Sequence, residues 1–354
     1  MAVKFNDEFS SDVSCVQEAS HLDCIKAIAD DDADMVTLDG GDIYIGGRDY
    51  NIKPVVAERY ETGDVSYYGV AVVNAASDIT FDTLQGKKSC HTGIGKTSGW
   101  NIPVGLLIEK EYIQPDEECN VPKAVGEFFV QSCVPGAKTP RYDPNGDNPD
   151  NLCELCIGVG DSNCARSQEE PYYDYSGSFR CLAEGAGDVA FVKHTTVLDN
   201  TDDNTPPGWG LNASSSDYKL LCVDGTTESD VSNYIGCNLA TVPSHGVMTS
   251  GDKSNSYVQS VETLLTDAQK MFGSDQNVNG FKMFDSSAYG GTDLLFLDST
   301  QALETLGNRD TYEEYLGKEY LEALRAITCD NGAGLLRGSL ALMVLLVLIV
   351  LGLK

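Results

Sequence analysis

One stretch of the chain combines the residue types that could bind an anion. Residues 87–101 read Lys-Lys-Ser-Cys-His-Thr-Gly-Ile-Gly-Lys-Thr-Ser-Gly-Trp-Asn, so that a glycine-spaced turn runs into an expected helix start. The first N–H groups of a helix have no acceptor within the helix, and the helix dipole is positive there. Thr92 and Lys96 would add a hydroxyl and an ammonium group. The stretch therefore predicts a binding site for an anion.

A nucleotide phosphate is one candidate for this anion, because Gly95-Lys96-Thr97 matches the end of the phosphate-loop pattern G-x-x-x-x-G-K-[ST]. The pattern requires glycine at position 90, where this chain has Cys90. No carboxylate in a matching context follows that could hold Mg²⁺. A small oxyanion held next to a metal ion is the favoured alternative.

The composition limits the partners and the compartment. The 354 residues include 54 acidic and 24 basic side chains, which give a formal net charge of −30. Such a charge argues against nucleic acid or anionic lipid as a partner. The chain has 12 cysteines, including Cys153-x-x-Cys156. No second Cys or His pair completes a zinc site and no strand-then-helix pattern frames a redox pair, so disulfides in an oxidising compartment are favoured.

Several elements could position polar side chains over a cleft. Residues 36–38 predict a strand that ends at Asp39, and residues 67–73 predict a strand buried on both faces and headed by Tyr67. Locally, Asp39 is as consistent with a turn aspartate, and Tyr67 with a buried, hydrogen-bonded tyrosine. Further along, the pattern predicts a loop-rich subdomain over 116–161, a strand over 189–192, and helices over 260–272 and 312–327.

Six further segments follow the anion stretch or precede it: 36–41 (VTLDGG), 53–58 (KPVVAE), 67–73 (YYGVAVV), 175–177 (YSG), 185–194 (GAGDVAFVKH) and 242–245 (VPSH). Together with KKSCHTG and GWNIP they resemble the transferrin family, in the same order, over about residues 12–329. The resemblance implies an α/β fold: a transferrin lobe of two subdomains, each similar to a periplasmic binding protein, with an interdomain cleft and disulfides. Subdomain 1 would comprise 1–66 and 246–329, and subdomain 2 would comprise 67–245. The segment that opens such a lobe is missing, which implies an incomplete N-terminus.

The resemblance implies ferric iron as the ligand, bound by Asp39, Tyr67, Tyr175 and His245. Tyr175 is chosen over its neighbours Tyr172 and Tyr173 because it directly precedes Ser-Gly, six residues before Cys181. Fe³⁺ is a hard cation that prefers charged oxygen ligands. Two phenolates and one carboxylate would balance its charge, and neutral His245 would add a nitrogen.

Carbonate or bicarbonate would complete the coordination, which is the role the resemblance gives to the anion stretch. Its expected contacts are Thr92, Lys96 and the N–H groups of Ser98 and Gly99. Most iron-binding relatives have arginine at the position of Lys96. The planar guanidinium of arginine can donate two parallel hydrogen bonds to carbonate, whereas the ammonium group of lysine cannot. We therefore expect weaker anion and iron binding. Lys193 matches one residue of a lysine pair that triggers iron release in some lobes, but its partner position is Leu297.

The resemblance also implies the disulfide pairs Cys90–Cys181, Cys133–Cys156, Cys153–Cys164, Cys222–Cys237 and Cys119–Cys329. Cys15 and Cys24 would be unpaired thiols or bonded to each other. Residues 212–214, Asn-Ala-Ser, form a glycosylation sequon at Asn212. The final segment, 330–354, has small residues, a short polar break and an apolar run. It predicts a GPI-attachment signal, or alternatively a short membrane anchor.

These features predict a protein of the extracellular space or cell surface that binds Fe³⁺ and carbonate reversibly and is not an enzyme. Its partners would be ferric iron and carbonate, the membrane through the anchor, and a cell-surface receptor. A structural or matrix role with weak or no iron binding is the main alternative. A hydrolase is disfavoured, because the chain has no Gly-x-Ser-x-Gly nucleophile elbow.

Overall fold

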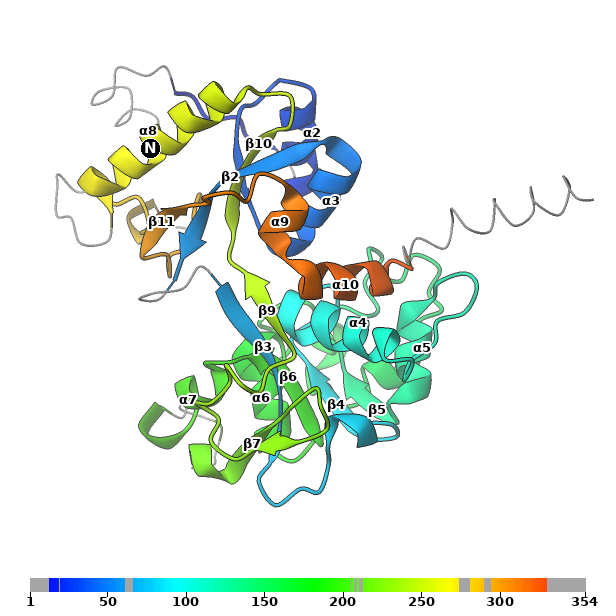
Figure 1. Cartoon of the computed structure of the whole chain (residues 1–354). Coiled ribbons are helices and arrows are strands. Elements are labelled where there is room, and N and C mark those ends of the chain that lie inside the picture. The colour runs from blue at the N-terminus through cyan, green and yellow to red at the C-terminus, as the bar shows by residue number, and fades with distance from the viewer. Residues whose placement is uncertain are drawn as a thin grey trace, which may run out of the picture. The chain divides into compact units, whose positions relative to one another are not determined.

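The computed structural model describes residues 13–18, 20–60, 66–204, 206, 209, 213–273, 281–289 and 294–329 (Figure 1). The chain forms two compact units, each made of two segments. Unit 1 comprises residues up to Val70 and Tyr234–Leu321; unit 2 comprises Ala71–Asn233 and the residues from Glu322. The subdomain boundaries expected from the sequence stay a prediction. Asn212 of the sequon and the expected anchor segment, 330–354, lie outside the described residues.

Unit 1 is built on a four-stranded antiparallel sheet with the order β1-β10-β2-β11. Its elements are α2 (His21–Ala29), β1 (Val36–Leu38), α3 (Gly40–Tyr50), β2 (Ile52–Arg59), β9 (Ala240–Pro243), β10 (Gly246–Ser250), α8 (Asn255–Phe272), a short helix at Ser287–Tyr289, β11 (Ala302–Thr305) and α9 (Tyr312–Leu316). Figure 1 shows α8 on one side of this sheet and α2 and α3 on the other.

The side chains of α8 form much of the core of unit 1. Val261, Leu265 and Phe272 are buried against Val56 of β2 and Leu303 of β11. The helix begins five residues before the expected position, because Ser254 caps it by accepting a hydrogen bond from the N–H of Tyr257. The helix over 260–272 predicted from the sequence is thus present, with an earlier start.

Unit 2 is built on a mixed sheet with the order β5-β4-β6-β3-β7-β8, to which β9 adds by pairing with β3. Its labelled elements are β3 (Ser66–Asn74), β4 (Lys88–His91), η2 (Thr97–Asn101), α4 (Ile102–Glu109), α5 (Val121–Phe128), β5 (Gln131–Cys133), α6 (Asp174–Ala183), β6 (Val189–Lys193), α7 (Thr196–Asp199), β7 (Tyr218–Leu221) and β8 (Thr227–Glu228). The first residues of β3 belong to unit 1. Short 3-10 helices lie at Phe81–Thr83, Asp150–Leu152, Gly160–Ser162, Asp202–Asn204 and Ser215–Asp217.

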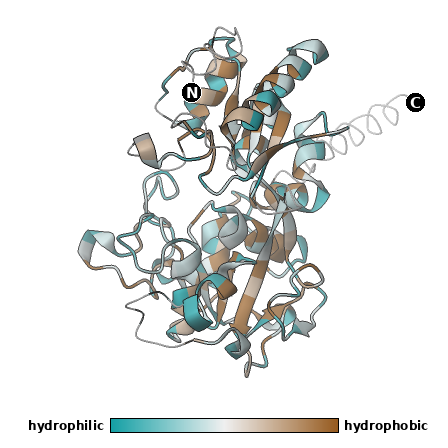
Figure 2. Ribbon diagram, turned by 90° about the vertical axis from the view of Figure 1, so that its left-hand side faces the viewer, coloured by the Kyte–Doolittle hydropathy of each residue, from teal (hydrophilic) through white to brown (hydrophobic). Residues whose placement is uncertain are grey.

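Strand β4 is parallel to both β5 and β6, whereas β3 is antiparallel to β7. In Figure 2 the strands carry mostly hydrophobic residues, while the helices carry both kinds. Val70, Val72 and Val73 of β3 are fully buried, as the apolar run predicted, but Tyr67 at its start is only partly buried.

One local prediction needs correction, and a second needs an addition. The helix expected over 312–327 is divided at Gly317, which has φ of +77° and separates α9 from α10 (Lys318–Ile327). The region 116–161 is loop-rich, as expected, but it also contains the helix α5, whose apolar residues Val121, Val125 and Phe128 are buried. Asn120 caps this helix by accepting from the N–H of Lys123. Within the described ranges, no helix is both long and apolar enough to cross a membrane.

Candidate metal and anion centre

The anion stretch lies in unit 2, between β4 and the continuous helical segment formed by η2 and α4. Residues 92–99, here called the anion loop, begin directly after His91 at the end of β4. The imidazole of His91 is fully buried between Ser89 Oγ (2.9 Å) and the carbonyl oxygen of Gly99 (2.7 Å). Burial lowers the pKa of His91 to about 4, so the ring is neutral at physiological pH. His91 therefore fixes the start of the helix and carries no charge.

Two hydroxyl groups in the anion loop have no internal partner. Thr92 Oγ1 and Ser98 Oγ are both fully buried, and neither makes a hydrogen bond to any described residue. A Cβ atom built on Gly99 would lie 2.0 Å from Thr92 Oγ1, so glycine is needed for this close approach. Buried hydroxyl groups almost always have a partner. These two are available to a ligand at the helix start.

Lys96, which the sequence assigned to the anion, is bound to a carboxylate in the structure. Its Nζ lies 2.7 Å from Asp174 Oδ1 and 4.3 Å from the centre of the Tyr173 ring. The backbone N–H of Asp174 donates to the carbonyl oxygen of Thr92 at 3.0 Å. The start of α6 and the anion loop are thus joined by a backbone bond and an ion pair.

Tyr175 is the second residue of α6 and is half-buried. Since Asp174 contacts both Thr92 and Lys96, the structure places Tyr175 next to the anion loop. The neighbouring tyrosines have other roles. Tyr172 is buried and its hydroxyl donates to Glu184 Oε2 at 2.8 Å, and burial raises the pKa of Tyr172. Tyr173 presents its ring to Lys96. Tyr175 remains the best ligand candidate of the three.

Asp39 and His245 are brought together in unit 1 by the register of two strands. Leu38 of β1 pairs with Gly246 of β10 in an antiparallel ladder. Asp39 follows Leu38 and His245 precedes Gly246, so the two residues come opposite each other at the same end of the sheet. Asp39 Oδ1 caps α3 by accepting from the N–H of Asp42 at 2.9 Å. Its Oδ2 makes no hydrogen bond to the described residues and can bind a cation.

The backbone of His245 is held on several sides. Its N–H donates to Tyr60 Oη at 2.8 Å, and its carbonyl oxygen accepts from the N–H of Glu58 at 2.8 Å and from Tyr315 Oη at 3.0 Å. Burial, with the nearby carboxylate of Glu58, raises the pKa of Tyr60 well above its ordinary value. Tyr60 is therefore a neutral support for His245.

Tyr67 lies on β3, opposite Val242 of β9. His245 follows on the same segment, after Pro243, which pairs with Ser66. The strand pairing thus places Tyr67 opposite the end of β9, three residues before His245. Asp39, Tyr67 and His245 belong to unit 1 and Tyr175 and the anion loop to unit 2.

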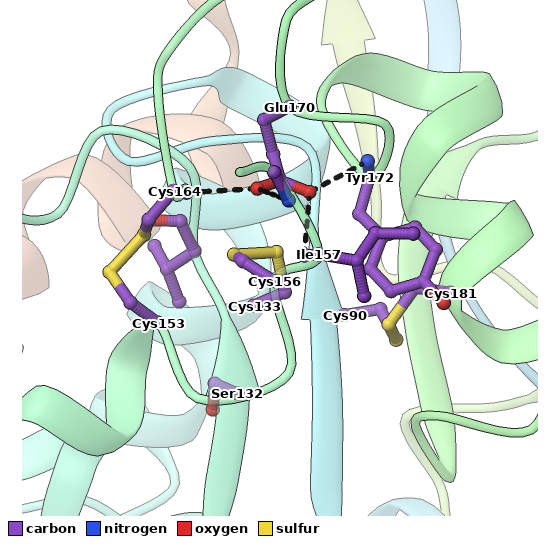
Figure 3. Close-up of a disulfide and its surroundings, with 12 residues drawn as sticks. Cys90, Ser132, Cys133, Cys153, Cys156, Ile157, Cys164, Glu170, Tyr172 and Cys181 are labelled. Carbon is purple, nitrogen blue, oxygen red and sulfur yellow. Dashed lines mark hydrogen bonds between the residues drawn. A yellow bond between two sulfur atoms is a disulfide. The ribbon is translucent and has the colours of Figure 1, made fainter. Parts of the chain in front are cut away.

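Glu170 was not identified from the sequence, yet it organises the segment that leads to α6. Its buried carboxylate accepts four backbone hydrogen bonds, from Ile157 (3.1 Å), Gly158 (2.9 Å), Cys164 (2.8 Å) and Tyr172 (3.1 Å). Figure 3 shows this carboxylate beside two disulfides of the same region. Glu170 therefore connects residues 157–164, here called the disulfide loop, to Tyr172, which lies just before Tyr175.

Four disulfides are formed by the pairs that the resemblance implied: Cys90–Cys181, Cys119–Cys329, Cys133–Cys156 and Cys153–Cys164. Cys222 and Cys237 are also disulfide-bonded. Cys15 and Cys24 are free thiols, which decides between the two states expected for them. Cys133, Cys156 and Glu170 lie close together, but the two sulfur atoms are bonded to each other and offer no thiolate to a metal.

Sequence reasoning missed Asp174 and Tyr60 as well as Glu170. Asp174 has φ of +66°, a conformation that aspartate adopts more readily than most residues, but this cannot be read from the sequence. Tyr60 contacts His245 across a large sequence separation. For Asp174, the sequence did offer one signal of a role at the site, namely its position directly before Tyr175.

Comparison with known proteins shows which family the chain belongs to. The family model "Transferrin" matches residues 1–329. Human melanotransferrin is 48% identical over 320 residues, which cover 89% of this chain and 41% of that protein. Bovine serotransferrin is 45% identical over 319 residues, with 88% and 42% covered. Otolith matrix protein 1 of Danio rerio is 41% identical over 322 residues, with 90% and 84% covered.

The chain therefore belongs to the transferrin family. It spans about two fifths of the length of melanotransferrin and serotransferrin, whereas it spans most of otolith matrix protein 1. The match covers both units, and the mixed α/β fold with its disulfides is that of a single lobe.

Proposed function

We propose that the chain binds Fe³⁺ reversibly, together with carbonate, for iron binding and transport outside the cell. The ion would be bound by Asp39, Tyr67, Tyr175 and His245. The observation that supports this most directly is the pairing of Leu38 with Gly246, because it brings a carboxylate and an imidazole together from distant parts of the chain. This proposal assigns binding, not catalysis, to the chain.

The donor set fits a hard trivalent cation. Three anionic oxygens would balance the charge of Fe³⁺, and the imidazole adds a neutral ligand. The Oδ2 atom of Asp39 remains available while Oδ1 caps α3. Since the four ligands come from both units, binding requires both units to reach one ion, and we propose that they close on it by hinge rotation.

Carbonate would bind in the anion loop. Thr92 Oγ1, Ser98 Oγ and the N–H groups of Ser98 and Gly99 offer neutral donors at a helix start. The ammonium group of Lys96 would add a positive charge, but it is shared with Asp174. We therefore propose that carbonate, and with it iron, binds more weakly than in lobes with arginine at this position.

A visible absorption titration with ferric nitrilotriacetate, with and without bicarbonate, tests the proposal. We expect a tyrosinate-to-iron charge-transfer band that requires bicarbonate and saturates at one iron per chain. Tyr175→Phe should abolish the band, whereas Tyr172→Phe should keep it, because the hydroxyl of Tyr172 is bound to Glu184. A folded protein without the band would contradict the proposal.

A structural or matrix role is the second candidate. Two observations favour it: the pairing of Lys96 with Asp174, and the similarity to otolith matrix protein 1, of which this chain covers 84%. A protein that folds, retains its disulfides and gives no ferric band at millimolar bicarbonate would support this role over iron transport.

We further propose a location at the cell surface, with residues 330–354 directing GPI attachment and a cell-surface receptor as a partner. The proposal rests on the apolar run near the end of the sequence. Release of the protein from expressing cells by a phosphatidylinositol-specific phospholipase is the expected result. Retention after this treatment would favour a membrane-spanning anchor.

A further inference from the structure

The ion pair between Lys96 and Asp174 lies at the proposed anion site itself. Lys96 is the residue before η2, and Asp174 is bonded through its N–H to Thr92, a residue of the same loop. The side chains are 24% and 35% exposed, so the pair is only partly screened by water. The positive charge of Lys96 and the negative charge of Asp174 therefore cancel at this site.

The ammonium group has limited capacity for another anion. One of its N–H donors points to Asp174 Oδ1 at 2.7 Å, and the ring of Tyr173 lies 4.3 Å from Nζ on another side. The other donors of the loop, Thr92 Oγ1 and Ser98 Oγ, are buried and have no partner among the described residues. The loop therefore offers free neutral donors beside a cation that is already paired.

The backbone holds Asp174 in this position. Its φ of +66° lies in the left-handed region, where a non-glycine residue is strained. The bond to the Thr92 carbonyl keeps the start of α6 against the loop. The carboxylate therefore faces Lys96 from a backbone position that is hydrogen-bonded to the anion loop itself.

We propose that Asp174 is an internal counter-anion that competes with the external anion for Lys96 and sets the anion affinity of the loop. This inference deepens the proposed function, since it concerns the same anion site. Carbonate must displace the carboxylate from Lys96 or bind beside it and experience its repulsion. Either way, Asp174 weakens anion binding.

Calorimetric titration of bicarbonate into the metal-free protein tests the inference without iron. Asp174→Asn removes the charge but keeps an oxygen that can accept from Lys96, and asparagine tolerates positive φ. We expect about tenfold tighter bicarbonate binding, as removal of one nearby charge predicts. Asp174→Gly, which also relieves the backbone strain, should give the same direction. In the double variant K96Q/D174N, affinity should return to about the wild-type value.

Asp150→Asn is the matched control, because Asp150 is an exposed aspartate paired with Lys138 at 2.8 Å in the same unit. It should leave bicarbonate binding unchanged. Equal or weaker binding by D174N, an equal gain in D150N, or no measurable binding by any variant would overturn the inference. A missing ferric band alone would not, since that result concerns only the proposed metal site.

Discussion

The backbone N–H of His245 donates to the hydroxyl of Tyr60 at 2.8 Å, and the two rings lie edge to face with centroids 6.4 Å apart. A phenol from the end of β2 therefore supports the proposed imidazole ligand without being a ligand itself. The shape of the site depends on residues that carry no part of the proposed metal chemistry.

Tyr60→Phe should destabilise unit 1 and weaken iron binding. The substitution leaves the partly buried N–H of His245 without its acceptor, which costs about 1 kcal/mol in the free energy of unfolding. Urea denaturation measures this change. Tyr50→Phe is the control, because the hydroxyl of Tyr50 makes no hydrogen bond within the described ranges, and it should have no comparable effect. Equal stability of both variants would refute the supporting role of Tyr60.

Asp39 should show separable structural and binding roles. Asp39→Asn keeps an oxygen that can cap α3, so stability should change little, while iron affinity should fall at least tenfold through loss of the charge. Asp39→Ala should lose the cap as well, at a cost of about 1 kcal/mol. Denaturation and the ferric titration, applied to both variants, measure the two effects. If D39N bound iron as tightly as wild type, Asp39 would be only a helix cap.

Thr92→Val and Ser98→Ala should weaken anion binding without destabilising the fold. Each removes a buried hydroxyl that lacks a partner, so the free energy of unfolding should stay equal or rise by about 1 kcal/mol. Bicarbonate affinity should fall several-fold. Ser132→Ala is the contrast, because the hydroxyl of Ser132 is bonded to Ser89 Oγ at 2.7 Å. That variant should be destabilised. Reduced stability of T92V and S98A would mean that these hydroxyls have internal partners.

His91 should contribute a pH dependence to stability. Burial lowers its pKa from 6.5 to about 4, so the unfolded chain binds more protons than the folded one between these values. The stabilisation is complete above about pH 6.5 and is lost as the pH falls towards 4, by up to about 3 kcal/mol. NMR titration of the His91 ring measures the native pKa directly. A midpoint near 6.5 would show that the ring is accessible to water.

Glu170→Gln should be strongly destabilising. The neutral amide places an NH₂ group against backbone donors and loses the charge that four N–H groups share, which we expect to cost about 3 kcal/mol. Glu169→Gln, at the exposed neighbouring position, should be neutral. Thermal unfolding compares the two. Similar melting temperatures would mean that the disulfides alone hold this loop.

The sequence predicted those features that depend on local order. The strand ending at Asp39 follows from an apolar run before a turn. The choice of Tyr175 as a ligand rested on the resemblance, which implies the tyrosine directly before Ser-Gly, and it stays a prediction. The resemblance added residues that no local pattern could connect, such as His245. The ion pair of Lys96 with Asp174 depends on positive φ and on contact between distant segments, neither of which has a sequence signal. Similarly, α5 was missed because its surroundings are rich in proline, glycine and aspartate.

The chain passes between the units at three points, and helix α10 contains the last of them, after Leu321. No single truncation can therefore yield either unit intact. A protease that cut near all three points would leave unit 2 as two peptides, of which the shorter begins at Glu322. The bond between Cys119 and Cys329 would keep these peptides attached, so they would separate on an electrophoresis gel only after reduction.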